Sequence, residues 1–207
     1  MSDNLPARTR PRGKLPSLAP YLEAEGWSAR VGDRAEHIRF PAIPATRPSD
    51  SPRQVYEAKR YALKVLRDAV ARFPAPHELA MAAEALSGAI QAPPDRAVVQ
   101  TAIALMLDAR TRLPPNPQAY IEALTYDLTD MGFPPAAVVA GCQRVRREAT
   151  FMPEIAEVVA ACREASNRYR LQAHHAERAS DEVLRMQEVI YRLNEELAAT
   201  PEPEEER

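Results

Sequence analysis

A stretch of 47 residues, from Glu154 to Thr200, contains neither proline nor glycine, although the chain of 207 residues has 20 prolines elsewhere. Proline inside a helix removes a backbone hydrogen bond and clashes with the preceding turn. The stretch therefore predicts one continuous helix, about 70 Å long at 1.5 Å per residue. Because this length exceeds that of a small domain, we expect part of the helix to project from the rest of the fold.

Apolar side chains recur along this segment with the 3.5-residue period of a coiled coil. With Ile155 at heptad position a, twelve of the thirteen a and d positions are apolar or weakly apolar, and the exception is Gln172. Further apolar residues at 159–161 widen the first third of this seam, which suits packing on a helical domain. The last third is a narrow stripe, hereafter the C-terminal stripe, of five residues: Val183, Met186, Ile190, Leu193 and Leu197.

The C-terminal stripe predicts a partner helix, since large apolar side chains left in water forfeit their burial energy. Our leading interpretation is self-association with a second copy of the chain. A narrow seam is compatible with two, three or four strands in either orientation. The alternatives are an antiparallel fold-back on the chain's own first helix, a monomeric helix with frayed ends, and binding to another protein.

Prolines divide the preceding part of the chain into shorter helical segments. Helices are expected over residues 53–72, 77–91, 95–112, 118–131 and 135–149. In the first of these, apolar residues follow the i, i+3, i+4, i+7 pattern of one helix face, and basic residues lie on the other faces of the helix. Aromatic residues make up only 6% of the chain, which favours helices over a sandwich or barrel. The fold class is therefore predicted to be all-α.

The predicted organisation has four parts. Residues 1–51 contain seven prolines and no helical or alternating period, so we expect a flexible and largely disordered arm. A helical bundle domain follows over residues 52–152. The long helix occupies residues 153–200, with its first third packed on the domain. Residues 201–207 form an acidic tail that contains proline.

Phenylalanine stands shortly before a proline at four positions. Phe40, Phe73 and Phe133 directly precede a proline, and Phe151 precedes one by two residues. Proline suits the first turn of a helix, and a large apolar residue just before the helix can fold back on that turn as a hydrophobic staple. We interpret each pair as a device that starts a helix.

No motif for catalysis or for cofactor or metal binding stands out in the sequence. Cys142 and Cys162 have no short paired spacing, which disfavours a zinc site or a disulfide framework. His174 and Glu177 lie one helical turn apart without a third ligand nearby, so we interpret them as part of a solvated face. The six glycines are scattered and form no phosphate-binding loop. We therefore predict a protein without enzymatic activity and without a cofactor.

Signals for export and for membrane insertion are also missing from the sequence. The start of the chain has no apolar run of the kind found in signal peptides. No stretch approaches the roughly 18 consecutive apolar residues of a membrane-spanning helix. A cytoplasmic protein with no membrane partner is the expectation.

Positive charge is concentrated at the front of the chain. Residues 1–72 contain 14 Lys and Arg against 8 Asp and Glu, although the whole chain has a net charge of −2. Two clusters are candidates for contact with nucleic acid: Arg8, Arg10, Arg12 and Lys14 in the arm, and Arg144, Arg146 and Arg147 near the end of the fifth predicted helix. The arm could contact phosphate weakly and without reading sequence. Arginines at a helix C-terminus also have a structural use, since they favour the helix dipole.

Residues 112–164 contain a pattern of three successive helix starts. A proline followed by Tyr-x-x-x-Leu begins one helix, a second helix starts after a proline and ends in arginines, and a Phe-x-Pro-x-x-x-Glu motif begins the third. The positions are Pro117, Tyr120 and Leu124, then Pro135 to Arg147, then Phe151, Pro153 and Glu157. This segment, about a quarter of the chain, resembles phage and prophage replication-accessory proteins of the helicase-loader type. The resemblance implies a small adaptor whose partners are a replicative helicase or an initiator.

Three functions compete on the sequence alone. The leading hypothesis is a non-enzymatic adaptor in phage or prophage DNA replication that binds protein partners through its helices and its arm. A structural or scaffolding protein of a phage particle is one alternative, for which a long exposed helix and an acidic tail are suitable. The other is a dimeric DNA-binding regulator, in which residues 118–131 and 135–149 would form a helix-turn-helix pair.

Overall fold

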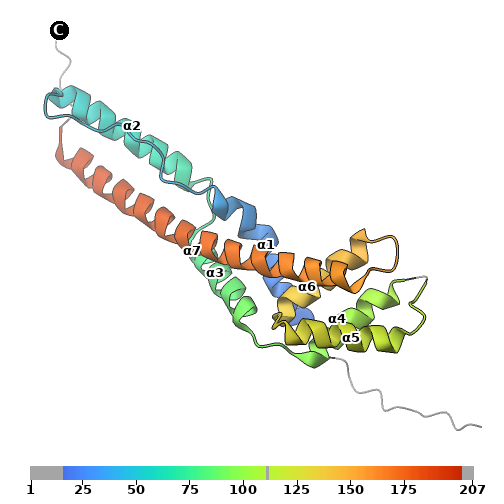
Figure 1. Cartoon of the computed structure of the whole chain (residues 1–207). Coiled ribbons are helices and arrows are strands. Elements are labelled where there is room, and N and C mark those ends of the chain that lie inside the picture. Colours follow the sequence, from blue (N-terminus) through green and yellow to red (C-terminus); the bar gives the residue numbers. More distant parts are fainter. Residues whose placement is uncertain (1–15, 111, 202–207) are drawn as a thin grey trace, which may run out of the picture. The chain divides into compact units, whose positions relative to one another are not determined.

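The computed structural model of the chain describes residues 16–110 and 112–201, apart from the side chains of residues 32 and 33. Within these ranges the secondary structure is helical and no strand occurs (Figure 1). The helices are α1 (Ala19–Glu36), α2 (Pro52–Val70), α3 (Pro76–Gln91), α4 (Arg96–Asp108), α5 (Pro117–Asp130), α6 (Pro135–Glu148) and α7 (Ile155–Ala199). The predicted all-α class and the long C-terminal helix are confirmed.

Local capping chemistry explains where the helices start. Ser51 and Gln54 form a capping box before α2, in which each side chain accepts the backbone N–H of the other residue. The Asp95 carboxylate accepts the first amides of α4, and the Asn116 side chain does the same at α5. Proline occupies one of the first two positions of α2, α5 and α6. The five helices predicted before the long one, α2 to α6, therefore begin within one residue of their predicted starts.

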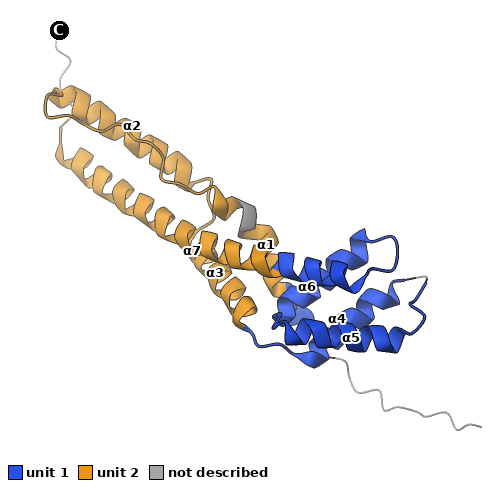
Figure 2. Ribbon diagram, in the orientation of Figure 1, with its two compact units in different colours: residues 1–22, 92–165 blue, residues 23–91, 166–207 orange. Residues whose placement is uncertain are grey.

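The chain divides into two compact units (Figure 2). Unit 1 comprises the described residues up to Leu22 together with residues 92–165. Unit 2 comprises residues 23–91 together with the described residues from Ser166 onward. This division differs from the single helical domain predicted over residues 52–152, because α2 and α3 share a compact unit and a core with the later part of α7.

In unit 1, α4 packs on α5 and on α6. Met106, Leu124 and Leu128 are fully buried and lie at the centre of the core. The first part of α6 is the most deeply buried segment, since every residue from Pro135 to Cys142 is shielded from solvent.

The beginning of α7 belongs to the same core. Val158, Val159 and Cys162 are buried, as predicted for the end of the long helix that packs on the domain, and Ile155 is half-buried. The backbones of α6 and α7 come close at Gly141, where a Cβ atom would lie 2.7 Å from the backbone nitrogen of Cys162. Glycine leaves room for this approach because it has no Cβ.

In unit 2, α1, α2, α3 and the later part of α7 surround a separate core. Leu66 of α2 is completely buried there. α2 runs antiparallel to α7: the Lys59 ammonium pairs with the Glu196 carboxylate at 2.9 Å, whereas beyond the other end of α2 the Ser180 hydroxyl donates to the Pro76 carbonyl at 3.2 Å.

The C-terminal stripe is covered inside unit 2. Val183 and Met186 are completely buried, Leu193 is 8% exposed, and Ile190 and Leu197 are half-buried. The stripe packs with α2 and its neighbours in the unit 2 core. The leading expectation, self-association through these five residues, is therefore wrong, and the antiparallel fold-back on the helix at residues 53–72 is the alternative that the structure shows.

The disordered arm predicted over residues 1–51 is also wrong for the residues that form α1. Val31 and Ala35 lie on one face of α1 and are buried in the unit 2 core, as is Ile38, two residues beyond the end of the helix. The Glu25 carboxylate accepts hydrogen bonds from the Tyr169 hydroxyl and the Arg168 guanidinium of α7. α1 is therefore an integral part of the fold and not an appendage.

Only part of the phenylalanine–proline interpretation holds. Phe133 directly precedes the N-cap residue of α6 and is buried. Phe73 is half-buried three residues before α3. A non-helical connection follows Phe40 until α2, and Phe151 is exposed, so neither of these two residues acts as a staple.

Candidate functional site

Residues 112–164, which contain the pattern of three helix starts, lie entirely in unit 1, where they form α5, α6 and the first part of α7. Pro117 stands in the first turn of α5, and Leu124 is completely buried in the core. The following proline, Pro135, starts α6. These positions of the pattern therefore serve the helical fold.

Tyr120 and Pro153, from two different parts of the pattern, are joined by a hydrogen bond. The Tyr120 hydroxyl donates to the Pro153 carbonyl at 2.9 Å. Burial, assisted by the neighbouring Cys142 and Glu157, raises the pKa of Tyr120 to about 12, so the hydroxyl stays protonated and able to donate. The bond fixes the residues just before α7 against α5.

Glu157 caps the start of α7. Its carboxylate accepts the backbone N–H of Glu154 at 2.9 Å, which satisfies one of the amides that a helix start leaves without a partner. A negative charge in the first turn also favours the helix dipole. The glutamate of the Phe-x-Pro-x-x-x-Glu motif thus has a clear structural task.

Arg110 holds the connection between α4 and α5 against the end of α6. Its guanidinium donates to the Val145 carbonyl at 2.7 Å and to the Ala149 carbonyl. Both acceptors are carbonyls at the C-terminal end of α6, where the helix dipole attracts positive charge, and the Val145 carbonyl also accepts the backbone N–H of Ala149. The α4–α5 and α6–α7 connections consequently lie together at one end of unit 1, which we call the loop end (Figure 1).

Phe151 is the residue of the pattern without a structural task. Its side chain is 83% exposed, the largest value among the exposed large apolar residues of the described chain. It stands between Ala149 and Pro153, whose carbonyls are both held by side chains from other segments. Leu113, 55% exposed, is a second large apolar side chain of the loop end. An aromatic side chain on an anchored loop is suited to insertion into a pocket of another protein.

The predicted arginine cluster of α6 does not act as one group. Arg144 forms ion pairs with Glu148, at 3.0 Å, and with Glu164 of α7, so its charge is matched within unit 1. Arg146 and Arg147 are exposed in the last turn of α6. The other predicted cluster, Arg8, Arg10, Arg12 and Lys14, lies outside the described residues.

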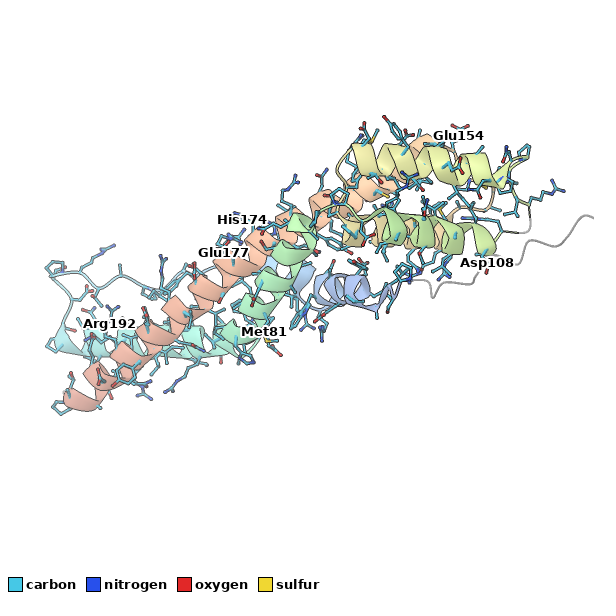
Figure 3. All side chains as sticks on the ribbon, turned by 90° about the horizontal axis from the view of Figure 1, so that it is seen from below. Met81, Asp108, Glu154, His174, Glu177 and Arg192 are labelled. Carbon is cyan, nitrogen blue, oxygen red and sulfur yellow. The ribbon has the colours of Figure 1, made fainter. Side chains whose placement is uncertain are left out.

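His174 and Glu177, both labelled in Figure 3, line a cleft of about 510 Å³ between α7 and α3 in unit 2. Glu84 and Asp181 stand at the same cleft. Nowhere in the described ranges, however, do three or more His, Cys, Asp or Glu side chains group so that they could hold a metal ion. The side chains that line the cleft therefore assign no catalytic or metal-binding role to it.

Cys142 and Cys162 are buried next to each other in the unit 1 core. Their mutual side-chain hydrogen bond and their burial raise the pKa of Cys142 well above its ordinary value. A thiol that stays protonated and shielded is a poor nucleophile. Both cysteines therefore serve as small apolar core residues, as the sequence indicates.

Sequence reasoning missed a groove on α2. The groove, about 610 Å³ in volume, is lined by basic and aromatic side chains of this helix and by Leu197 of α7. The signal was present, because Arg60, Lys64 and Arg67 recur once per turn, but basic residues on the outside of an amphipathic helix are usually only solvated. Their grouping with tyrosines becomes evident once the end of α7 lies beside them.

Comparison with known proteins returns no match to this chain, whether with family models, with curated proteins or with solved structures. Among the helices of the described ranges, none combines the length and the hydropathy needed for a membrane span. The function is therefore inferred from the sequence pattern and the geometry of the chain itself.

Proposed function

We propose that this protein is a non-enzymatic adaptor in phage or prophage DNA replication that resembles a helicase loader. Its loop end would bind a replicative helicase or an initiator in the cytoplasm. One observation carries the proposal: Phe151 is 83% exposed, whereas the pattern residues around it are buried or hydrogen-bonded.

Energetics support a binding role for this side chain. Full burial of a phenylalanine side chain is worth about 1.5–3 kcal/mol, and the fold of unit 1 does not use this energy. Hydrogen bonds from Arg110 and Tyr120 hold the backbone on either side of Phe151. A loop that is already ordered loses less conformational freedom on binding, so more of the burial energy appears as affinity.

The burial of α6 disfavours the alternative of a dimeric DNA-binding regulator. A recognition helix presents its N-terminal residues to base edges in the major groove. In α6, residues Pro135 to Cys142 are buried in the unit 1 core and cannot be presented in this way. Dimerisation through the C-terminal stripe, which the regulator also needs, would compete with the unit 2 core.

The proposal is tested by measuring the affinity of the full chain for the purified replicative helicase and initiator of its host. We expect Phe151→Ala to weaken binding at least tenfold, as for an aromatic hot spot worth about 1.4 kcal/mol or more. Tyr126→Ala is the matched control, because Tyr126 is an exposed aromatic residue of α5 in the same unit, 65% exposed. It should change the affinity less than twofold.

Two results would overturn the proposal. One is that the wild-type chain binds neither the helicase nor the initiator. The other is that Phe151→Ala and Tyr126→Ala bind equally well, which would show that exposure alone does not mark a contact. Thermal melting of both variants verifies that any loss of affinity is not a loss of fold.

A further inference from the structure

The groove on α2 combines positive charge with aromatic surface. It lies within unit 2 and is lined by Tyr56, Arg60, Tyr61, Lys64 and Arg67 of α2, with Leu197 from the last turns of α7 as part of its wall. Three cationic side chains line it against a single carboxylate, that of Asp68. Its surface therefore favours an anionic ligand.

The cations are regularly spaced and two of them are not matched by carboxylates. Arg60, Lys64 and Arg67 follow one another at successive turns and extend over about 10 Å of the helix axis. Arg67 donates to the neutral side-chain oxygen of Asn194, at 2.8 Å, and Lys64 forms no ion pair with any described residue. By contrast, Lys59 on the same helix is paired with Glu196 and does not line the groove.

Two tyrosines give the groove faces on which a planar ring can stack. Tyr61 is 56% exposed. Tyr56 is half-buried, and the Arg60 guanidinium lies 6.0 Å from its ring centroid. A basic groove with aromatic side chains is the arrangement by which proteins bind single-stranded nucleic acid without sequence preference, the cations contacting phosphates and the rings stacking on bases.

We propose that this groove binds a single-stranded nucleic acid. The three cations extend over about 10 Å of the helix axis, so they can contact successive phosphates of one strand. A duplex fits the chemistry less well, because its bases are stacked inside and offer no face to Tyr61. The site uses side chains of unit 2 and is independent of the protein contact proposed for the loop end of unit 1.

The test measures fluorescence anisotropy of a labelled oligothymidylate of about twelve nucleotides with the full chain at several salt concentrations. Lys64→Ala/Arg67→Ala should lower the affinity at least tenfold at low salt. It should also reduce the slope of log K against log salt by about 1.4, since each lost phosphate contact on a single strand contributes about 0.7. Arg96→Ala/Arg163→Ala is the matched control, because it removes the same charge from two exposed positions of unit 1 and should have a much smaller effect.

Tyrosine variants distinguish a nucleic acid from an acidic protein segment. Tyr61→Ala should weaken oligothymidylate binding about fivefold or more, whereas Tyr61→Phe should retain it, because phenylalanine keeps the stacking face. Polyglutamate serves as an anionic competitor without bases and should displace the oligonucleotide poorly.

The proposal is overturned if the two double variants lose the same affinity, since the binding would then follow net charge or lie elsewhere, for instance at Arg8 to Lys14. It is also overturned if polyglutamate competes as well as unlabelled oligothymidylate while Tyr61→Ala has no effect, which would make the groove a site for acidic peptides. Neither result bears on helicase binding through Phe151, so the two proposals fail separately.

Discussion

Replacing Gly141 with alanine should destabilise the protein, although the same change in most helices is stabilising. Alanine in a helix interior is favoured over glycine by about 1 kcal/mol. At Gly141, however, the new Cβ would lie 2.7 Å from the backbone nitrogen of Cys162 and 2.8 Å from its Cα, where ordinary contacts begin near 3.4 Å. Two of the three obstructing atoms belong to the backbone, so a side-chain rotation cannot remove the clash.

The magnitude follows from the movement that alanine requires. To reach ordinary contact, α6 and α7 must separate by about 0.7 Å, the difference between 3.4 and 2.7 Å. A gap of 0.5–1 Å forfeits roughly a quarter to a half of the dispersion energy of the atoms that face it. Overpacking of a close-packed core typically costs about 1–3 kcal/mol. We take the upper end of this range because backbone atoms must move. Subtracting the gain in helix propensity, about 1 kcal/mol, leaves a net loss of about 1–2 kcal/mol in the free energy of unfolding.

Urea denaturation followed by circular dichroism provides the measurement, with Gly88→Ala as the matched control. Gly88 lies in α3 and has no atom within 4 Å of the position of a Cβ, so this variant should gain about 0.5–1 kcal/mol. Adding Cys162→Ala to Gly141→Ala should not restore the loss, because the backbone atoms of residue 162 remain in place. A Gly141→Ala protein as stable as the wild type, or a full rescue by Cys162→Ala, would refute the close approach of the two backbones.

Three further outcomes are expected. Gly26→Ala should raise the free energy of unfolding by about 0.5–1 kcal/mol, because residue 26 lies inside α1 with open space around it; a lower melting temperature would contradict the helix. Tyr120→Phe should cost about 1 kcal/mol through loss of the bond to Pro153. The pKa of Tyr120 is about 12 in the folded protein, against an ordinary value of 10.0. The contribution of Tyr120 to wild-type stability should therefore be complete below pH 10.0 and should decline as the pH rises through 12. A Tyr120→Phe variant with an equal alkaline decline would contradict this assignment. Ile190→Asp/Leu193→Asp should lower the melting temperature by placing charges in the unit 2 core, and a variant that melts like the wild type would show that the stripe is not buried there.

The helices from α2 to α7 could be predicted because particular residues in the sequence determine where most of them begin. Prolines and N-cap side chains such as Asp95 and Asn116 act over one turn of helix, so they can be read without knowledge of the rest of the fold. The predicted end of α4 was less accurate, because the helix ends at Asp108 and not at residue 112. The connection beyond it is shaped by Arg110, which turns to the carbonyls of α6, a contact 35 residues or more away in sequence.

α1 could have been recognised from its apolar spacing but not from its composition. Ala24, Ser28, Val31, Ala35 and Ile38 are all buried and follow a regular pattern of four and three residues. One of the five is polar, and two glycines interrupt the segment, which lowers its intrinsic helix propensity. The prolines on both sides added to the impression of disorder. The helix is stabilised mainly by the surface of α7 that it covers, and this surface is not evident from residues 1–51 alone.

Phe151 was misread because the staple requires a particular position. The hydrophobic staple uses the residue directly before the N-cap, and α7 begins at Ile155 with Glu154 before it. Phe151 is therefore two residues too early to reach the first turn. Phe133 precedes the N-cap of α6 directly and is buried, as the rule requires. The spacing to the N-cap residue, and not the spacing to the proline, thus distinguishes Phe133 from Phe151.

The burial of the C-terminal stripe changes which surfaces are left for partners. A narrow apolar seam gains the same energy from any helix that covers it, so the sequence of α7 alone cannot distinguish a second copy from the chain's own α2. Lys59 pairs with Glu196 and Arg67 with Asn194 in the intramolecular arrangement, and both contacts join residues more than 120 positions apart. Once α2 covers the stripe, its opposite face turns outward with Lys64 and Tyr61, and the groove arises from the same packing that removes the dimer interface. A variant that loosens α2 from α7 should therefore lose the proposed nucleic-acid binding together with unit 2 stability, and it should leave the helicase binding proposed for Phe151 in unit 1 unchanged.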